Sequence, residues 1–340
     1  MAIGRVQYLK TIGLKSNQPV GRGFVFPYDV AFSKDGSLFV LNRGRANGAQ
    51  QTRIQICTFD EEYIGEFGNG IGVNDDQFMS PVSMCFTEDG LLCVTDEILD
   101  EIKVFNSSGN FVKRFGPDLG DGVKLGGPSG IAVGKDGNLY VAEQRNHRVH
   151  KLTPDGKSIL RWGEMGNAAG QFNKPWGLSV DLDNNVYVSD WKNDRIQKFT
   201  ADGEFLHAFG ESGSDEGQLR RPSSVVADRN GLVYVADWGN ERVQVFDSDG
   251  VFCQILRGEA TLPKWAVEWL ESNQDQLSAR DRSELFINDL PPHLRDPYHL
   301  SSQNESLFWG PVSVKVDGMG RLYVTEHSRA RIQVYQINQG

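Results

Sequence analysis

The sequence predicts an all-β fold, a six-bladed β-propeller with four antiparallel strands in each blade. A proline opens each repeat, and three successive intervals between these prolines are 47 residues long; the prolines are Pro27, Pro81, Pro128, Pro175, Pro222 and Pro311. Within each repeat, short runs of β-branched and aromatic residues are separated by Asp-Gly or Asn-rich turns, as in an antiparallel meander. A period in the forties with four strands per unit is the signature of a propeller, in which radial repetition protects the sheet edges.

The repeat between Lys174 and Gly210 shows the expected elements of one blade. Pro175 opens the first strand, Asp190 ends the second, and an Asp-Gly turn separates the third from the fourth. Because the turns are short, consecutive strands should pair as neighbours, from the central channel outward. The apolar runs of these four strands are 178–180, 186–188, 196–199 and 204–209.

The ring is expected to close by joining the two ends of the chain. The sixth repeat, Pro311 to Gln336, contains only three of the four strands, and Arg5–Gly13 has the form of the missing fourth. Pairing these segments would tie both ends into one sheet and remove a free edge. We also expect no removable targeting segment, because no charged and then apolar leader precedes Arg5.

Residues 1–340 are expected to form one domain with an insertion at 259–309. A first helix is predicted from apolar residues at helical spacing, namely Leu262, Trp265, Trp269 and Leu270. A second short helix is predicted at 278–286, and the prolines and polar residues from 291 to 305 predict a loop. The apolar face of the first helix must be buried, either as a lid over the channel mouth or as a patch on the outer rim.

The repeat pattern resembles the NHL repeat family. It reads Pro, an apolar run, Asp-Gly, an apolar run, an acid and then Asn-x-Arg before the third strand, over 127–152, 175–199 and 222–246. The resemblance covers nearly the whole chain outside 259–309 and implies the fold strongly but the function weakly, since propellers carry unrelated activities. Propellers that resemble this family include a peptide-amidating lyase, which holds zinc with histidines near the starts of first strands. Here those places hold no histidine, so we expect no three-histidine zinc site; they are Tyr28, Val82, Ser129, Trp176, Ser223 and Val312.

Bulk composition narrows the classes of partner. The net charge is −10, which repels phosphate backbones, so nucleic-acid binding is not expected. No apolar run approaches the roughly 20 residues that a membrane-spanning helix needs. Cys57, Cys85, Cys93 and Cys253 lack the paired spacing of a zinc site and are expected to be small core residues of a soluble, cytoplasmic protein.

The functional face should be the one that carries the variable loops. The Asp-Gly turns are uniform and share one face, whereas the loops between second and third strands and the insertion lie on the other. Functional side chains are usually placed on variable loops above a rigid scaffold. We therefore expect the binding site at the channel mouth on the second face.

Acidic residues end five of the six second strands at this mouth; the six positions are Asn42, Asp96, Glu143, Asp190, Asp237 and Glu326. One interpretation is a site for a divalent cation, calcium or zinc, held by the five carboxylates. The other is that each acid pairs with the arginine five residues later, because arginine and carboxylate suit bidentate pairing. The pairs would be Glu143/Arg148, Asp190/Arg195, Asp237/Arg242 and Glu326/Arg331.

Two neighbouring blades depart from this rule. Asp96 faces Glu101 instead of an arginine, and Asn42 leaves Arg53 without its carboxylate. The spare charges could pair across the blades or contact a ligand. Related propellers use carboxylates with calcium, or a single glutamate, for chemistry, so Glu326 beside His327, or Asp96 with Glu101, are the candidate catalytic groups as acid, base or metal ligand.

Aromatic residues supply the other half of the expected site. Tyr28 and Trp176 follow opening prolines, and Trp191 and Trp238 follow the motif acids, where Arg43 and His327 stand in other blades. These side chains could pack on neighbouring blades or form the floor of a funnel for an apolar or cationic ligand. The predicted ligand-binding set is Tyr28, Arg43, Arg53, Trp176, Trp191, Trp238 and His327.

Two functions remain open from the sequence. The first is binding of a small molecule, a peptide or a protein at the mouth, which the absence of a recognisable catalytic motif favours. The second is a lyase or hydrolase, metal-assisted or not, with its active site in the same funnel.

Overall fold

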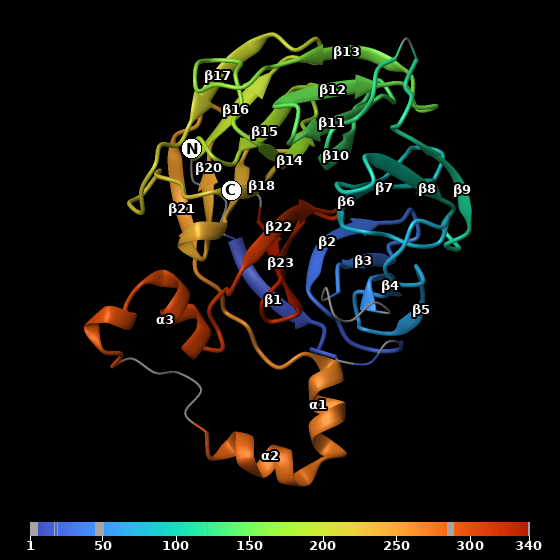
Figure 1. The fold of residues 1–340 in the computed structure, drawn as a ribbon. Coiled ribbons are helices and arrows are strands. Elements are labelled where there is room, and N and C mark those ends of the chain that lie inside the picture. The colour runs from blue at the N-terminus through green and yellow to red at the C-terminus, as the bar shows by residue number, and fades with distance from the viewer. Residues whose placement is uncertain are drawn as a thin grey trace.

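The computed structural model describes residues 6–16, 18, 20–44, 51–120, 122–283 and 289–338. These residues form six four-stranded antiparallel sheets arranged radially around a central axis (Figure 1). The predicted six-bladed propeller is therefore confirmed. First strands of neighbouring blades lie against one another around the axis, and the fourth strands form the outer edge.

The blades follow one another in chain order, and only the last draws on both ends of the chain. Blade one is β2 (Pro27–Phe32), β3 (Leu38–Asn42), β4 (Arg53–Cys57) and β5 (Tyr63–Phe67). Blade two is β6 (Pro81–Phe86), β7 (Leu92–Asp96), β8 (Glu101–Phe105) and β9 (Phe111–Phe115), and blade three is β10 (Pro128–Val133), β11 (Leu139–Glu143), β12 (Arg148–Leu152) and β13 (Ser158–Trp162). Blade four is β14 (Pro175–Val180), β15 (Val186–Asp190), β16 (Arg195–Phe199) and β17 (Phe205–Phe209), and blade five is β18 (Pro222–Ala227), β19 (Val233–Asp237), β20 (Arg242–Phe246) and β21 (Phe252–Leu256).

Blade six closes the ring as the sequence predicts. Its strands are β22 (Pro311–Val316), β23 (Arg321–Glu326), β24 (Arg331–Ile337) and, on the outside, β1 (Val6–Ile12). β1 pairs antiparallel with β24 from Val6 opposite Ile337 to Ile12 opposite Ile332. Arg5 lies outside the described residues. The outer edge of β24 is covered by this pairing, so the last blade is as complete as the others.

Each opening proline pairs with the residue that ends the second strand, as in Pro175 opposite Asp190 and Pro311 opposite Glu326. Proline has no N–H to donate and is tolerated at the first position of a strand. The residues that follow proline and acid therefore come to the same end of the blade. This register places two side chains per blade at one mouth of the channel.

The core is divided among the blade interfaces. Leu38, Val40 and Ile332 are fully buried between blades six and one, and the other interfaces hold similar sets of aliphatic and aromatic side chains. Burying one such side chain stabilises the fold by about 1.5–3 kcal/mol. Cys57 and Cys93 are buried, and Cys85 and Cys253 are partly buried; all four are free thiols. Burial raises the pKa of Cys57 and Cys85 to about 12, so these two thiols stay protonated.

A repeated hydrogen bond, here called the blade latch, joins four successive pairs of blades. The residue before the third strand has a positive φ and accepts the N–H of the residue before the next opening proline. Because the third strand and the following linker belong to different blades, each latch fixes the angle between two neighbours. The latches are Asp100 to Gly127 at 2.6 Å, His147 to Lys174 at 3.2 Å, Asp194 to Arg221 at 2.7 Å and Glu241 to Gly310 at 2.5 Å.

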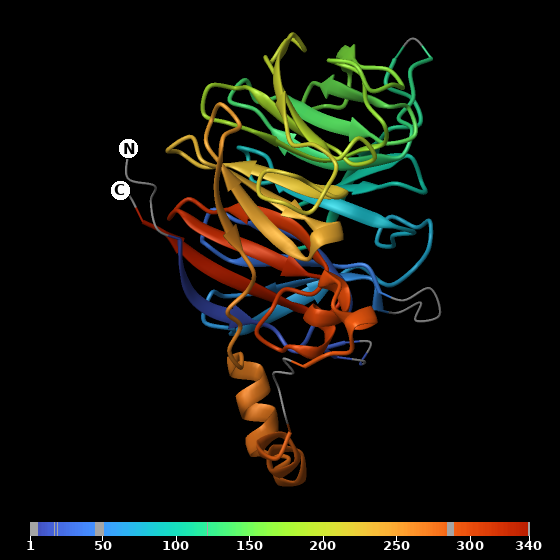
Figure 2. The same cartoon turned by 90° about the vertical axis from the view of Figure 1, so that its left-hand side faces the viewer.

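The insertion contributes three α-helices: α1 (Lys264–Glu271), α2 (Gln274–Asp281) and α3 (Pro297–Gln303). α1 and α2 project from the rim of the disc beside blades six and one (Figures 1 and 2). The predicted first helix is present, and Trp265 anchors it: its indole N–H donates to the Glu61 carbonyl, and its ring lies 5.7 Å from that of Phe24. Among the described residues of 259–309, none lines the cavity at the channel mouth described below, whereas α3 contacts the 3-10 helix at Trp238–Asn240 of blade five.

Two details of the insertion differ from the sequence predictions. The second helix begins at Gln274 rather than at 278 and ends at Asp281, and residues 284–286 of the predicted helix lie outside the described residues. The loop prediction for 291–305 is wrong over α3 and over the short 3-10 helix η3 (Pro292–Leu294). α3 forms because Pro297 takes its first turn and the Asp296 side chain accepts the N–H of His299, which is a standard N-terminal cap.

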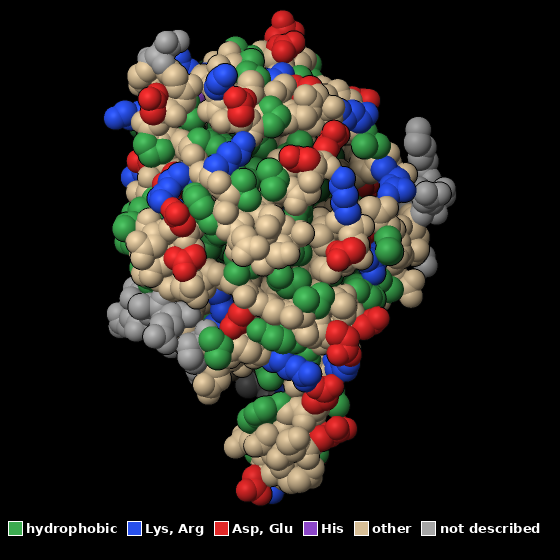
Figure 3. Space-filling view, turned by 90° about the vertical axis from the view of Figure 1, so that its right-hand side faces the viewer, with side chains coloured by type: hydrophobic (Ala, Val, Ile, Leu, Met, Phe, Trp, Pro, Cys, Tyr) green, Lys and Arg blue, Asp and Glu red, His purple; other side chains and the backbone are tan. Residues whose placement is uncertain are grey.

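Charged side chains are interspersed on the surface. On the side of the molecule seen in Figure 3, acidic and basic side chains alternate over the disc and do not gather into a patch of one sign. Among the described residues, no helix is long and apolar enough to cross a membrane.

Candidate ligand-binding site

A cavity of about 200 Å³, here called the aromatic cup, lies at the channel mouth. It is lined by residues of blades one, four, five and six: Tyr28, Trp176, Trp191, Ser223, Trp238, Val312 and His327. Five of these seven belong to the predicted ligand-binding set. The structure thus brings together Tyr28, Trp176, Trp191, Trp238 and His327 in one place.

The strand register explains why these side chains meet. Tyr28, Trp176, Ser223 and Val312 each follow an opening proline, and the other three each follow a second-strand acid or its equivalent. Trp238 begins the short 3-10 helix η2 (Trp238–Asn240), which replaces the turn found at this place in blades two, three, four and six. Ser223 and Val312 were not assigned to the site from the sequence, although they share the position of Tyr28 and Trp176 in the repeat.

The rings of the cup are in contact with one another and with arginines at the border. The Trp176 and Trp191 centroids are 6.2 Å apart, and the Arg221 guanidinium lies 5.4 Å from the Trp191 ring. Tyr28 meets His327 edge to face at 5.7 Å. The cup is therefore a concave surface made mainly of aromatic rings, and such surfaces bind apolar groups and cations.

His327 contributes an uncharged imidazole to the cup. Burial, together with the nearby positive charge of Arg43, lowers its pKa to about 4. The ring also lies 4.7 Å from the Phe26 ring, and its Nδ1 is 3.5 Å from the Ser328 hydroxyl. At neutral pH the imidazole carries a lone pair on one nitrogen and a proton on the other.

Arg43 stands behind Tyr28 and does not line the cup. Its guanidinium lies 4.6 Å from the Tyr28 ring and pairs with Glu97 and Ser80. Glu97 in turn accepts a 2.7 Å hydrogen bond from Gln144. This chain links blades one, two and three, so Arg43 supports the Tyr28 wall from outside.

Arg53, also predicted as a ligand residue, is only 1% exposed and lies away from the cup. Its Nε is 3.0 Å from Glu66 of the same blade, and its other nitrogens donate to the carbonyls of Gln18 and Gly23. The suggested pairing of Arg53 with the spare acid of blade two is therefore wrong. The adjacent strand already supplies Glu66 as its carboxylate.

The two acids of blade two are engaged locally. Asp96 accepts the backbone N–H groups of Met79 and Ser80 at 2.7 and 3.1 Å. Glu101 lies 3.5 Å from Lys103 and 3.6 Å from Arg114. Both acids are buried at the end of the blade, and neither lines the cup.

The proposed arginine pairs of the other blades are all present. The shortest contacts are Glu143–Arg148 at 2.6 Å, Asp190–Arg195 at 2.9 Å, Asp237–Arg242 at 2.7 Å and Glu326–Arg331 at 2.7 Å. Each acid also accepts a hydrogen bond from a third-strand side chain, namely His150, Gln197, Gln244 or Gln333. Within the described ranges, no three His, Cys, Asp or Glu side chains lie close enough to hold a metal ion. The carboxylates proposed as calcium or zinc ligands are thus not brought together.

The channel narrows below the cup to a space of about 20 Å³. Asp29, next to Tyr28, accepts hydrogen bonds from Ser83 at 2.7 Å and Ser313 at 2.6 Å and lies 3.3 Å from Lys315. These side chains come from blades one, two and six, and they form a polar cluster in the channel. Asp29 is absent from the residues predicted from the sequence, and the one signal for the polar cluster is an acid within an otherwise apolar first strand.

The fold and the cup define a six-bladed β-propeller with an aromatic cavity at the mouth of its channel. Three stretches, residues 125–152, 172–199 and 219–246, match the NHL repeat family. Blades three, four and five of this six-bladed propeller therefore carry NHL repeats.

Solved structures with low sequence identity share the fold. Virginiamycin B lyase from Staphylococcus aureus is 15% identical, with a TM-score of 0.55 over 98% of this chain and 99% of that one. A streptogramin B lyase structure is 15% identical in sequence, with a TM-score of 0.56 over 98% of each chain. A protein of unknown function from Bacteroides thetaiotaomicron is 17% identical in sequence, with a TM-score of 0.62 over 97% of this chain and 75% of that one. No curated protein matches the sequence. At these identities the likeness concerns the fold alone.

Proposed function

We propose that this NHL propeller is a binding protein whose aromatic cup holds an apolar or cationic group of a small molecule or peptide. The observation that supports it is the convergence of five ring side chains from four blades on one cavity. Mostly apolar cavities with a few polar groups are the usual sites for small ligands. Ser223 and the neutral His327 are the polar groups at the cup wall.

Fluorine NMR of protein labelled with 5-fluorotryptophan tests this proposal. The chain has seven tryptophans, so each resonance can be assigned by a single Trp→Phe variant. The first probes are tetramethylammonium and a neutral alcohol with a neopentyl group of similar shape. A fragment library and capped dipeptides follow. We expect the resonances of Trp176, Trp191 and Trp238 to shift, while that of the buried Trp265 stays in place.

Variants separate the cup from other surfaces. Trp238→Ala should weaken a cup ligand about tenfold, because one aromatic wall is worth roughly 1–2 kcal/mol. Trp269→Ala is the matched control, since Trp269 is 46% exposed on α1 and does not line the cup. A folded protein whose three cup resonances respond to no fragment, while other tryptophans do, would overturn the proposal.

A second candidate function is a lyase or hydrolase that uses His327 as a general base. His327 is the one titratable group among the cup-lining residues besides Tyr28, and it is uncharged at neutral pH. A catalytically inactive variant of the S. aureus lyase, with a histidine replaced by alanine, was solved with quinupristin. Incubation of this protein with quinupristin, followed by mass spectrometry, checks the enzymatic alternative; turnover that His327→Ala abolishes would support it over binding alone.

A further inference from the structure

We propose that the protein has a second ligand site, on the rim, for a single-chain amphiphile with a carboxylate head. A cavity of about 550 Å³, here called the rim groove, lies between α1, α2 and blade six. Its volume falls within the range of about 300–1,000 Å³ typical of small-molecule sites. It shares no lining residue with the aromatic cup.

One wall of the rim groove is apolar and belongs to α1. Trp265 fixes this helix to the propeller, so the next turn stands away from the disc with its apolar side toward the groove. Pro263, Ala266 and Leu270 are buried there, whereas Trp269 is 46% exposed. A half-exposed tryptophan beside a cavity leaves a large apolar surface in water, and covering it with a hydrocarbon chain would be favourable.

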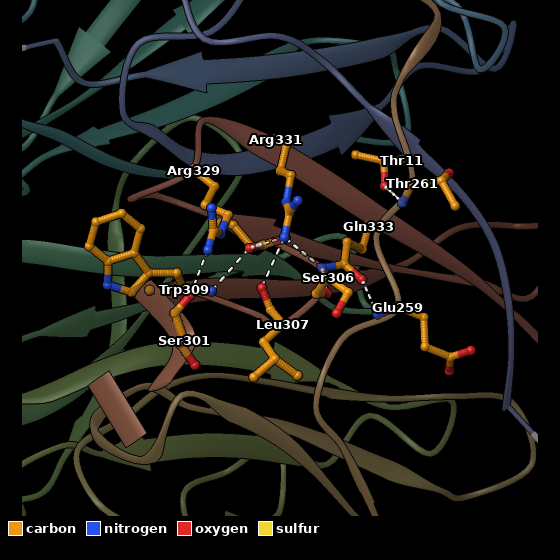
Figure 4. A network of polar contacts seen from close by, with 12 residues as sticks. Thr11, Glu259, Thr261, Ser301, Ser306, Leu307, Trp309, Arg329, Arg331 and Gln333 are labelled. Atoms are coloured by element: carbon orange, nitrogen blue, oxygen red, sulfur yellow. Dashed lines mark hydrogen bonds and ion pairs between the residues drawn. The ribbon is translucent and has the colours of Figure 1, made fainter. Parts of the chain in front are cut away.

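The opposite wall is basic and belongs to blade six. Arg329 lies 5.5 Å from the Trp309 ring and donates to the carbonyls of Ser301 and Asn304 at 2.6 and 2.8 Å (Figure 4). Arg329 makes no ion pair with any carboxylate among the described residues, and its buried Nε has no hydrogen-bond partner. Burial lowers the pKa of this guanidinium, yet an arginine stays charged at neutral pH.

The basic charges of the rim groove exceed its acidic ones. Arg280 is paired with Glu305, and Arg331 is paired with Glu326 at 2.7 Å. Lys15, which is exposed at the same cavity, has no ion pair with a described carboxylate. Two cations, Lys15 and Arg329, are therefore left without an acidic partner in a chain whose net charge is −10. Such a site favours an anionic head next to an apolar body.

The rim groove is built from parts that are separately held in place. Figure 4 shows Arg329 and Arg331 reaching toward the segment 301–307, and Glu259 donating its N–H to Gln333. At the same end of the insertion as Glu259, Thr261 donates its N–H to Tyr8 at 2.9 Å. The two ends of the insertion are thus hydrogen-bonded to blade six, so the basic and apolar walls face each other without a ligand.

Isothermal titration calorimetry with decanoate, below its micelle-forming concentration, is the direct test. We expect decanoate to bind with one site per chain, decanol to bind at least about tenfold more weakly, and decylammonium and acetate not to bind. In 5-fluorotryptophan protein, decanoate should shift Trp269 and Trp309 and leave Trp176, Trp191 and Trp238 in place. This pattern distinguishes the rim groove from the cup.

Variants at four positions complete the experiment. Lys15→Gln, at an exposed position, should weaken decanoate about fivefold, the scale of a partly exposed ion pair, while Lys15→Arg should retain binding. Trp269→Ala should weaken decanoate and decanol equally, and Trp191→Ala, in the cup, should change neither. Equal affinity for decanoate, decanol and decylammonium, or binding that is unaffected by Lys15→Gln and by Trp269→Ala, would overturn the proposal. Arg329→Gln would be interpreted only if circular dichroism shows a native fold, because Arg329 also holds α3.

Discussion

Glu241 accepts the backbone N–H of Gly310 at 2.5 Å, across the junction where the insertion interrupts the ring. It is the fourth blade latch and the one whose two residues are separated by the whole insertion. Glu241 is only 6% exposed, and no basic side chain forms an ion pair with it among the described residues. Burial raises the pKa of its carboxyl from the ordinary 4.5 to about 7, and the nearby Glu326 adds to the increase.

The latch at Glu241 should make stability depend on pH. Between pH 4.5 and about 7 the unfolded chain releases this proton while the folded protein keeps it. The stabilisation is therefore fully present below pH 4.5 and is lost as pH rises through about 7. Glu241→Gln keeps an oxygen acceptor and cannot ionise, so we expect it to be more stable than the parent at pH 8, by about 1–3 kcal/mol, and similar at pH 4.5. Urea unfolding at both pH values measures this.

The control is the preceding latch, Asp194. Asp194 accepts the Arg221 N–H at 2.7 Å and the Ser212 hydroxyl at 2.6 Å, so Asp194→Asn weakens two charge-assisted hydrogen bonds. This variant should lose stability at pH 8. An advantage of Glu241→Gln that is the same at pH 4.5 and pH 8 would contradict our account.

Ligand affinity at the cup should be insensitive to pH over the physiological range. The pKa of His327 is about 4, so its charge does not change between pH 5.5 and 8. As pH falls through 4 the imidazole gains a charge, and a cationic probe should then bind more weakly by like-charge repulsion. The shift of the Trp238 fluorine resonance, recorded at saturating and half-saturating tetramethylammonium at each pH, measures the affinity. An affinity midpoint near pH 6.5 would show that His327 is more hydrated than the structure indicates.

Removing the acid of one buried ion pair should be strongly destabilising. Asp237 and Arg242 are 0% and 1% exposed and are 2.7 Å apart. Asp237→Ala leaves a buried arginine without its counter-charge, which costs about 3–5 kcal/mol. Denaturant unfolding should show the loss, and the second substitution Arg242→Leu should recover part of it. Asp183→Ala, at an exposed turn, is the control and should change stability by less than about 0.5 kcal/mol.

The contribution of β1 to the final blade can be measured with two residues of that strand. Ile12 is fully buried, whereas Leu9 is 41% exposed. Ile12→Ala should cost about 2–5 kcal/mol in the global unfolding transition, the range for a buried aliphatic side chain. Leu9→Ala should cost less than about 1 kcal/mol. Equal, small effects of both substitutions would mean that β1 detaches without unfolding the propeller.

The repeat made the fold predictable to a high degree. The period placed all six opening prolines at strand starts, and the three-stranded last repeat indicated the role of the N-terminal strand. The local order within the insertion was harder to predict. α3 depends on the cap formed by Asp296, which is a short-range signal in a segment rich in proline. The placement of α1 on the rim depends on Trp265 finding Glu61 and Phe24, two contacts far away in the sequence.

The candidate site was predictable in part. Repeat position was enough to gather Tyr28, Trp176, Trp191, Trp238 and His327, because equivalent positions of a closed ring converge on its axis. Repeat position did not predict the partners of the charged residues, because a position in the repeat does not say which side chains pair with one another in the folded chain. Glu66, the partner of Arg53, comes from the fourth strand, outside the motif, whereas Glu97, the partner of Arg43, holds the equivalent position of the neighbouring blade.

The polar cluster around Asp29 narrows the channel below the aromatic cup. About 20 Å³ remains below the aromatic rings, room for roughly one water molecule. This space does not admit a guest larger than about one water molecule, so we expect guests to enter and leave the cup through the channel mouth. If the protein is an enzyme, product and incoming substrate would compete for the same opening of the cup, and product inhibition would be competitive.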